Sequence, residues 1–325
     1  MPNELASIIV FTYNQEDLIE DALNSSLYQD YRPLELIICD DASKDRTGEV
    51  CKEWIKARGS FFDRILYCRN ETNLGTTGNI HKGIGLSRGS IIKLLGGDDL
   101  LAPAAIKNGA RFLEETSALV IFGNVIGFEW DGKSFLALET EPKLHTRRLL
   151  SLPPRRQFGI LSSCSSIPAP GALYRRSFFE QVEPKGQDTF HVPDWPRWLK
   201  ATSLGIPLVY RDFDAVYYRS HTHGHKNAAY KEKCHRDVLD CIEKLIRTNE
   251  ELLTPLERMA VWANRKKHEK LLAKRNFEAQ LYNAFMTLLK ISIRSSLYLP
   301  IASDTAARQH PGSALELPFK LRIPS

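Results

Sequence analysis

The amino-acid sequence predicts an α/β protein with a mostly parallel sheet flanked by helices and a helical C-terminal extension. Through about residue 125, short apolar runs alternate with segments whose apolar residues recur at the helical period. This alternation is typical of βαβ units, which form a parallel sheet covered by helices on both faces. From about residue 228 onward the pattern is helical and basic, so we expect further helices after the sheet.

The individual elements follow from these patterns in chain order. Buried strands are expected at Ser7–Phe11, Leu34–Cys39, Ile65–Cys68, Ile91–Leu95 and Leu119–Asn124. Helices are expected at Asp17–Leu27, Asp45–Ala57, Thr77–Ser87, Pro103–Glu115, Arg175–Val182 and Trp195–Leu204. Ser43 stands just before the second of these helices and is a candidate cap for it. The Pro-rich tail from Gln309 predicts no regular structure.

Composition excludes several classes of protein. Hydrophobic residues make up 43% and charged residues 26%, which is the ordinary globular mixture. A net charge of +5 is too small to indicate nucleic-acid binding by itself. The six cysteines form no C-x-x-C pair, so we expect free thiols in a reducing cytoplasm. Neither a signal peptide nor an apolar run of about 18 residues is found, so no transmembrane helix is expected.

Polar residues follow the first two expected strands, and ligands of such sheets bind outside the carboxyl ends of the strands. Thr12, Tyr13 and Asn14 supply a hydroxyl, a ring and an amide, which fit a nucleobase; a turn that contains Asn explains them equally well. Asp40 and Asp41 end the second strand, and two adjacent carboxylates are costly if they are buried without partners. One of them is placed to cap the next helix, and the other to accept a hydrogen bond, for example from a uracil imide.

The third ligand-facing strand end reads Gly96-Gly97-Asp98-Asp99. Two glycines permit a close backbone approach, and two carboxylates beside a diphosphate require a divalent cation between them. Mg²⁺ and Mn²⁺ prefer oxygen ligands and stabilise a departing nucleoside diphosphate as Lewis acids. The alternative is an acidic turn without a ligand.

Five motifs together resemble glycosyltransferase family 2, a large inverting family with the GT-A (Rossmann-like) fold. They are Ile8-Ile9-Val10-Phe11-Thr12-Tyr13-Asn14, Asp40-Asp41-Ala42-Ser43-Lys44-Asp45, Asn73-Leu74-Gly75, Ser87-Arg88-Gly89 and Gly96-Gly97-Asp98-Asp99, in the family's order over about the first 115 residues. The resemblance implies that Thr12 and Tyr13 line the base pocket and that Asp41 reads the base. It also implies that Asp98 lies near the ribose and that Asp99 binds Mn²⁺ or Mg²⁺.

The chain departs from the family at two places in this half. Many members carry a third acid two residues before Asp98, where this chain has Gly96. Many also carry an Arg-Asn pair after the Asn-x-Gly motif, where this chain reads Gly78-Asn79-Ile80-His81-Lys82. Asn79 and Lys82 are therefore candidates to meet the pyrophosphate, and a solvated helix face is the alternative explanation.

The acceptor half needs a general base that takes the proton from the attacking hydroxyl. The family usually supplies it from a Glu-Asp pair, and here Asp194 matches the second acid while Pro193 replaces the first. An ordinary N-cap is the alternative role for Asp194. Trp195 and Trp198 fit either a sugar platform or the core. Tyr217-Tyr218-Arg219-Ser220-His221 resembles the family's closing Arg-x-His element, which makes His221 a candidate metal ligand.

The sequence thus predicts an inverting, metal-dependent glycosyltransferase of bacterial cell-surface polysaccharide or lipopolysaccharide assembly. The expected partners are a nucleotide-sugar donor, with a UDP-sugar favoured, and a saccharide or glycolipid acceptor. A polyprenyl-phosphate glycosyltransferase and a non-catalytic nucleotide-sugar-binding protein remain the alternatives. We expect a nucleotide-sugar-binding half at 1–125, an acceptor-binding half at 126–227, and a helical extension with an irregular tail at 228–325. Within the extension, Leu281–Leu299 fits peripheral contact with the inner face of the membrane, packing on the catalytic domain, or pairing in a homodimer.

Overall fold

A computed structural model describes residues 4–130, 135–163, 167–183, 190–220 and 228–295. Its centre is a nine-stranded sheet in the order β3-β2-β1-β4-β8-β6-β9-β5, with β7 paired to β6. The strands are β1 Ala6–Thr12, β2 Leu34–Asp40, β3 Arg64–Arg69, β4 Ile91–Gly96, β5 Leu100–Leu101, β6 Val120–Trp130, β7 Phe135–Glu141, β8 Ala172–Arg175 and β9 Val209–Arg219. The strands β3, β2, β1 and β4 are all parallel, whereas β8 is antiparallel to both β4 and β6. The predicted α/β fold is confirmed.

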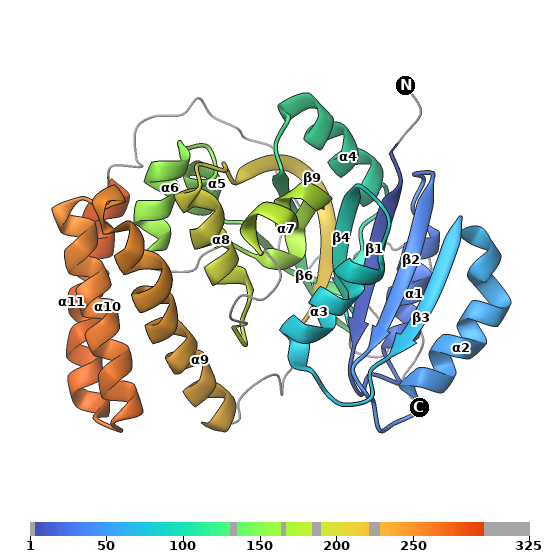
Figure 1. Cartoon of the computed structure of the whole chain (residues 1–325), viewed down its shortest axis with the longest axis horizontal. Coiled ribbons are helices and arrows are strands. Elements are labelled where there is room, and N and C mark those ends of the chain that lie inside the picture. Colours follow the sequence, from blue (N-terminus) through green and yellow to red (C-terminus); the bar gives the residue numbers. More distant parts are fainter. Residues whose placement is uncertain (1–3, 131–134, 164–166, 184–189, 221–227, 296–325) are drawn as a thin grey trace.

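Helices cover both faces of the sheet and continue beyond it. They are α1 Ile19–Leu27, α2 Thr47–Arg58, α3 Gly75–Leu86, α4 Ala105–Thr116, α5 Leu144–Leu149, α6 Pro154–Leu161, α7 Arg176–Val182, α8 Asp194–Ser203, α9 Ala228–Cys241, α10 Pro255–Leu272 and α11 Asn276–Ser295. Figure 1 shows α9, α10 and α11 at the end of the molecule away from β3 and α2. None of the described helices is both long and apolar enough to cross a bilayer.

The central strands are buried on both faces, which explains their continuous apolar runs. Ile8 on β1 belongs to a buried cluster with residues of α1, α2 and α4, whereas Ile9 belongs to a second buried cluster with residues of α6, α7 and α8. Cys241, Ile242 and Ala260 of the C-terminal helices belong to the same buried cluster as Ile9. Leu289, in the segment 281–299, belongs to this cluster too. The described part of that segment therefore packs on the rest of the protein, which is one of the three roles expected for it.

The expected cap of α2 is wrong in detail. Helix α2 begins at Thr47, and its first turn is held by the Asp45 carboxylate, which accepts hydrogen bonds from the Thr47 backbone N–H (3.0 Å) and hydroxyl (2.6 Å). The Ser43 hydroxyl instead accepts a hydrogen bond from the Asn14 backbone N–H at 3.0 Å. Ser43 therefore joins two strand ends, and Asp45, which is nearer the helix, accepts from the first N–H group of α2.

The motif Ser87-Arg88-Gly89 is explained by a buried acid. Glu35 on β2 is fully buried and accepts hydrogen bonds from the Ser7 hydroxyl (2.5 Å), the Arg88 and Gly89 backbone N–H groups, and Arg64 (2.6 Å). Burial opposes ionisation of Glu35, but these hydrogen bonds outweigh it and lower the pKa of the carboxyl group. The motif therefore holds the segment that leads into β4 against β1 and β2 through hydrogen bonds to Glu35.

Replacing Glu35 by alanine is expected to lower the free energy of unfolding by about 3–5 kcal/mol, because it leaves the partly buried Arg64 and several buried donors unpaired. Because the folded pKa of Glu35 lies below the unfolded one, this stabilisation is present at neutral pH and is lost as the pH falls through the folded pKa. Denaturant unfolding of the unchanged protein and of Glu35→Ala measures the effect. Glu115→Ala, which removes a half-exposed partner of Arg111, is the matched control and should change stability by about 0.5 kcal/mol or less. Equal losses in the two variants would contradict the role of Glu35.

Candidate active site

The carboxyl ends of β1, β2 and β4 meet at one edge of the sheet. Their parallel register sets Thr12 opposite Asp40 and Phe11 opposite Gly96. Beyond the strands the pairing continues for one more step, since the Asp41 N–H donates to Thr12 O (2.9 Å) and the Gly97 N–H to Phe11 O (3.0 Å). The sequence motifs at 12–14, 40–45 and 96–99 are therefore neighbours in space, as Figure 1 lets the reader follow.

Backbone and side-chain hydrogen bonds join the first two motifs. The Lys44 N–H donates to Asn14 Oδ1 (2.7 Å), and Asn14 adopts a left-handed φ of 52° that an Asn tolerates. Thr12 is buried and its hydroxyl donates to Gln15 Oε1 at 2.8 Å. Tyr13 is 41% exposed. Of the two residues expected in the base pocket, Tyr13 is thus accessible to a ligand, whereas the Thr12 side chain is buried and hydrogen-bonded within the loop.

Asp41 is buried at the centre of the second motif. Its Oδ1 accepts hydrogen bonds from Asn70 Nδ2 (2.7 Å) and from the Leu74 backbone N–H (2.8 Å). The Asn73-Leu74-Gly75 motif therefore folds back onto Asp41. Asn79 is buried as well, and its Nδ2 donates to Cys39 O (2.9 Å) while its Oδ1 accepts from Asn70 (3.0 Å). Asn79 belongs to the network beneath the site and does not lie on a solvated helix face.

A close contact with Thr12 requires glycine at position 97, whereas a Cβ at position 96 would meet only the ends of two carboxylate side chains. A Cβ at Gly97 would lie 2.5 Å from Gln15 Oε1 and 2.8 Å from Thr12 Oγ1. A Cβ at Gly96 would lie 2.8 Å from Asp98 Oδ1 and 3.2 Å from Asp99 Oδ2. The two carboxylates thus converge on the place where position 96 carries no side chain.

Asp99 and Asp98 differ in their surroundings. Asp99 is buried, and its Oδ1 accepts a hydrogen bond from the Arg219 backbone N–H at 3.1 Å. Burial raises the pKa of Asp99 well above its ordinary value, the charge of Asp98 raises it further, and Arg219 and Lys93 oppose both effects. Lys93 is itself buried, which lowers the pKa of its ammonium to about 7. The side chain of Asp98 is half-buried at the edge of the sheet.

Arg219, the last residue of β9, fixes the acidic turn from the other side. Its Nε donates to Asp98 O at 3.0 Å, and its Nη2 forms a buried ion pair with Asp21 of α1 at 3.1 Å. The guanidinium also lies 4.9 Å from the centre of the Phe128 ring. The Arg of the closing element therefore positions the Asp98-Asp99 turn, while His221 lies outside the described residues.

Asp194 is the first residue of α8, and its side chain is 37% exposed. Arg197, one turn later and fully buried, lies 3.7 Å from Asp194 and forms an ion pair with Glu183 at 2.6 Å. Burial raises the pKa of Asp194, Arg197 lowers it and Glu183 raises it, with a raised pKa as the result. Burial opposes the charge of Glu183 too, but Arg197 and His81 outweigh it and lower the pKa of Glu183 to about 2.

Tyr218 on β9 is affected by the charges of both the acidic turn and Asp194. Its pKa is raised first by burial and then by the charges of Asp99, Asp98 and Asp194. The charges of three carboxylates therefore act on one phenol, and Tyr218 is itself 46% exposed. Sequence reasoning assigned Tyr218 no role, since an aromatic residue in a strand is ordinary.

The segment that leads into Asp194 is held from two directions. The Thr77 hydroxyl of α3 donates to Phe190 O at 2.5 Å. On the other side, Asp237 of α9 accepts a hydrogen bond from the Val192 backbone N–H (2.9 Å) and contacts His191 Nδ1 (3.1 Å). The C-terminal extension therefore contributes directly to the position of Asp194, a contact that no local sequence pattern indicates.

Two further predictions concern tryptophans and the metal. Trp195 and Trp198 are buried in the core, where Trp198 packs edge-to-face on Phe122, so neither forms a sugar platform. Among the described residues, no group of three or more His, Cys, Asp or Glu side chains could hold a metal ion. Mg²⁺ and Mn²⁺ are often held by one or two carboxylates together with substrate phosphates, and the convergent Asp98 and Asp99 fit that pattern.

A mixed sheet of this order, with nucleotide-site motifs at the ends of β1, β2 and β4, defines a glycosyltransferase of the GT-A type. The chain belongs to glycosyl transferase family 2, whose family model matches residues 7–183. It is 26% identical over 229 residues to the Escherichia coli UDP-Glc:alpha-D-GlcNAc-diphosphoundecaprenol beta-1,3-glucosyltransferase WfaP. The aligned residues cover 70% of this chain and 82% of WfaP. It is 26% identical over 133 residues to glycosyltransferase GlyG of Streptococcus pneumoniae, covering 41% of this chain and 43% of GlyG.

Solved structures share the fold. Residues 1–349 of Staphylococcus aureus TarS in complex with UDP-GlcNAc superpose with a TM-score of 0.58 at 16% identity, covering 97% of this chain and 99% of that one. The mannosyltransferase PcManGT of Pyrobaculum calidifontis, in complex with GDP-Man and Mn²⁺, gives a TM-score of 0.54 at 15% identity, covering 90% and 86%. At these identities the likeness concerns the fold alone.

Proposed function

We propose that this glycosyltransferase transfers a sugar, with inversion, from a nucleotide-diphosphate sugar to a saccharide or glycolipid acceptor in bacterial cell-surface polysaccharide or lipopolysaccharide synthesis. The observation that carries the proposal is the meeting of the motifs at 12–14, 40–45 and 96–99 at one edge of the sheet, where the carboxylates of Asp98 and Asp99 converge. A UDP-sugar is the favoured donor, because WfaP uses UDP-Glc and TarS binds UDP-GlcNAc. The described cysteines are free thiols, which fits a cytoplasmic reaction.

In the donor half, residues 1–125, the open Tyr13 ring stacks on the base, and Asp41 accepts a hydrogen bond from the base edge. The metal, Mn²⁺ or Mg²⁺, stabilises charge on the departing diphosphate when it is bound. We assign the accessible ligand position to Asp98. Asp99 lies behind it and is tied to Arg219, so it fixes the turn and completes the carboxylate pair.

In the acceptor half, residues 126–227, Asp194 takes the proton from the acceptor hydroxyl as that oxygen attacks the anomeric carbon. Its raised pKa and open side chain fit a general base, because an ordinary surface Asp is a weaker proton acceptor. Arg197 lowers the pKa of this carboxyl group and so favours its deprotonated form. The extension, residues 228–325, supplies Asp237 to hold the segment before Asp194.

A donor screen tests the proposal. Purified protein is incubated with a panel of UDP-, GDP- and dTDP-sugars and Mn²⁺, and released nucleoside diphosphate is measured. We expect metal-dependent release with one donor, and NMR of the product with a saccharide acceptor should show an inverted anomeric centre. Nucleotide binding without metal dependence and without turnover of any donor would favour a non-catalytic nucleotide-sugar-binding protein, for which the residues Gly96 and Pro193 are the best argument.

The pH profile should respond to Glu183. Because Asp194 acts in its deprotonated form, kcat/KM falls as the pH drops through the pKa of Asp194, which is raised. Glu183→Gln removes a negative charge that raises this pKa, so the acid limb should move to lower pH. Steady-state rates between about pH 4 and about pH 8 measure the shift. This range extends from the ordinary pKa of an Asp, about 4, to just above neutral pH. Glu180→Gln, an exposed change on the same helix α7, should leave the limb in place. A limb that is unmoved by Glu183→Gln means that another group is titrating.

Asp237→Ala should lower kcat by about 10- to 100-fold, because misplacing a catalytic group by about 1 Å costs up to that much. The KM for the donor should hold, since the donor motifs lie elsewhere. Asp237→Asn, which keeps an acceptor for the Val192 N–H, should restore part of the rate. Asp240→Ala on the exposed side of α9 is the control, and an equal kcat in the two alanine variants would refute the positioning role.

A further inference from the structure

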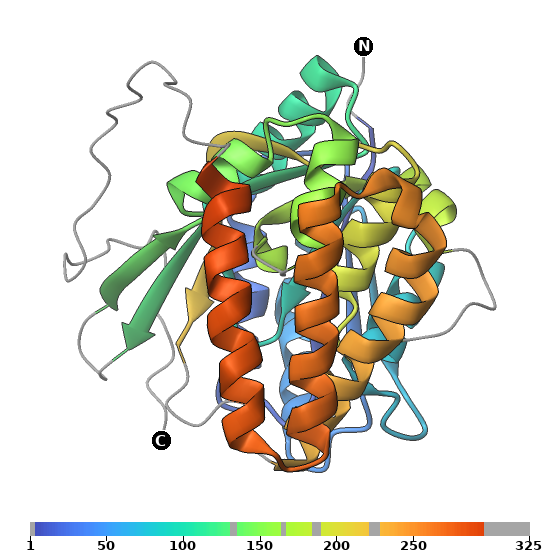
Figure 2. The same cartoon turned by 90° about the vertical axis from the view of Figure 1, so that its left-hand side faces the viewer.

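Helices α10 and α11 present an exposed apolar surface. Figure 2 shows the two helices side by side across one end of the molecule. Large hydrophobic side chains on them are between 37% and 73% exposed, and we call this set the α10–α11 face: Met259, Trp262, Phe277, Leu281, Phe285 and Leu288. On α11 they recur at intervals of four, four and three residues, which places them on one side of the helix. Met286 and Leu289 are buried on another side of the same helix.

The net positive charge of the protein is concentrated on these two helices and the turn between them. Residues 255–295 contain nine Lys or Arg and three Asp or Glu, a net charge of +6, whereas the whole chain is +5 and the remainder is therefore −1. Glu269 pairs with Arg265 and Lys266, and Glu278 pairs with Lys270 and Arg275, so two acids are shared among four bases and an excess of cations remains.

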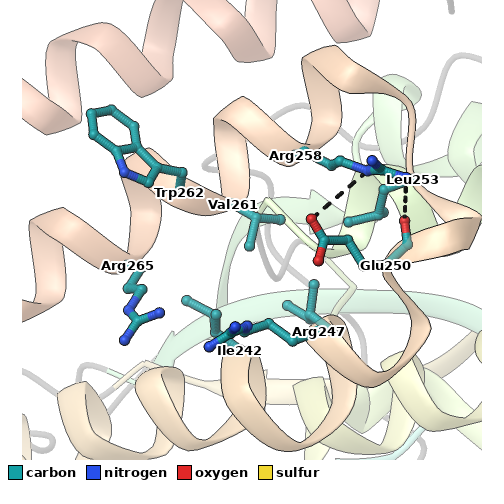
Figure 3. Close-up of a pocket in the computed structure, with 9 residues that line it drawn as sticks. Ile242, Arg247, Glu250, Leu253, Arg258, Val261, Trp262 and Arg265 are labelled. Atoms are coloured by element: carbon teal, nitrogen blue, oxygen red, sulfur yellow. Dashed lines mark hydrogen bonds and ion pairs between the residues drawn. The ribbon is translucent and has the colours of Figure 1, made fainter.

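A cavity of 240 Å³ opens beside the same face (Figure 3). Its lining includes apolar residues such as Ile242, Leu253 and Val261, together with Trp262, the acid Glu250 and three arginines, Arg247, Arg258 and Arg265. Each arginine already has a carboxylate partner, since Arg258 pairs with Glu250 and both Arg247 and Arg265 pair with Glu243. The cavity alone therefore does not make an anion site, but its arginines are held beside the exposed Trp262.

We propose that the α10–α11 face docks the protein on an anionic membrane surface. Exposed aromatic and aliphatic side chains with surrounding Lys and Arg are the combination that inserts at a headgroup boundary and attracts anionic lipid. A second copy of the chain is a poorer occupant of this face, because residues 255–295 of each copy carry a net charge of +6 and would repel each other. The inference extends the proposed function, in that a glycolipid acceptor would lie in that membrane, but the binding itself requires no turnover.

Vesicle flotation tests the surface without using activity. The full chain is mixed with phosphatidylcholine vesicles or with vesicles that contain phosphatidylglycerol, and the floating fraction is measured at low and high salt. We expect flotation with the anionic vesicles alone, weakened by salt. The double variant Leu281→Ser/Leu288→Ser should reduce the floating fraction about tenfold. Lys274→Glu/Arg275→Glu should reduce it similarly while leaving every apolar side chain in place.

The control double variant is Leu144→Ser/Leu204→Ser, whose leucines are similarly exposed but lie at the start of α5 and just after α8, and it should float like the unchanged protein. Transfer to a short water-soluble acceptor should be equal in all variants, so failure of the proposed function is seen separately from failure of the docking surface. Equal flotation of Leu281→Ser/Leu288→Ser and its control overturns the proposal. Light scattering that shows a dimer broken by Leu281→Ser/Leu288→Ser, with no vesicle binding, assigns the face to subunit contact instead.

Discussion

Replacing Asp194 by asparagine is expected to lower kcat for transfer to a saccharide acceptor by about 10²–10⁴-fold, the range that a general base contributes. Asparagine keeps the size of the side chain and its place at the start of α8, but it cannot take a proton. The neighbouring Arg197 and Glu183 keep their ion pair, so the fold should be unchanged. Initial rates at saturating donor and acceptor measure the loss.

The control for this substitution is Glu180→Gln, which neutralises an exposed acid on α7 and should leave kcat unchanged. UDP binding should be equal in both variants, since Asp194 lies on the acceptor side. If Asp194→Asn retains most of its turnover with a polyprenyl phosphate, the attacking oxygen is already ionised and the acceptor is that phosphate. Full turnover with a saccharide acceptor would exclude Asp194 as the base.

The half of the fold that carries the donor motifs could be predicted because its strands are buried on both faces. A short, largely apolar run such as 34–39 is typical of a buried strand in a parallel sheet, and β2 indeed spans Leu34–Asp40. Strand β9 was missed, because Val209–Arg219 mixes Arg211, Asp212 and Asp214 with its apolar residues. These polar groups are satisfied by partners that are distant in sequence, such as Asn124, whose amide donates to both aspartates.

The candidate site divides in the same way. Residues at strand ends and at a helix start, such as Asp41 and Asp194, follow from local patterns and from a resemblance that those patterns support. The contacts that decide what each acid can do are long-range: Asp99 with Arg219 is separated by 120 residues, and Val192 with Asp237 by 45. No periodicity or spacing encodes such pairs, because each member is ordinary in its own segment.

The clearest case is the acidic turn, where sequence reasoning placed the metal mainly on Asp99. Burial of Asp99 under the Arg219 N–H, with Asp98 half-buried beside it, leads to a different expectation. Asp98→Asn should remove Mn²⁺-dependent UDP binding and lower kcat by about 100-fold or more, since Lewis-acid stabilisation is worth several kcal/mol and each 1.4 kcal/mol is about tenfold. Calorimetric titration of UDP with and without Mn²⁺ measures the binding, and the melting temperature should hold.

Asp99→Asn is the matched comparison, one residue away and of the same chemistry. Its amide oxygen can still accept from Arg219, but the lost charge leaves the buried Arg219 and Lys93 less well neutralised. We therefore expect a lower melting temperature and a smaller loss of metal-dependent UDP binding than in Asp98→Asn. If Asp99→Asn instead loses all metal-dependent binding at an unchanged melting temperature, while Asp98→Asn retains it, then Asp99 is the ligand. Because the two substitutions remove the same charge from adjacent residues, only their different positions in the fold can separate the outcomes.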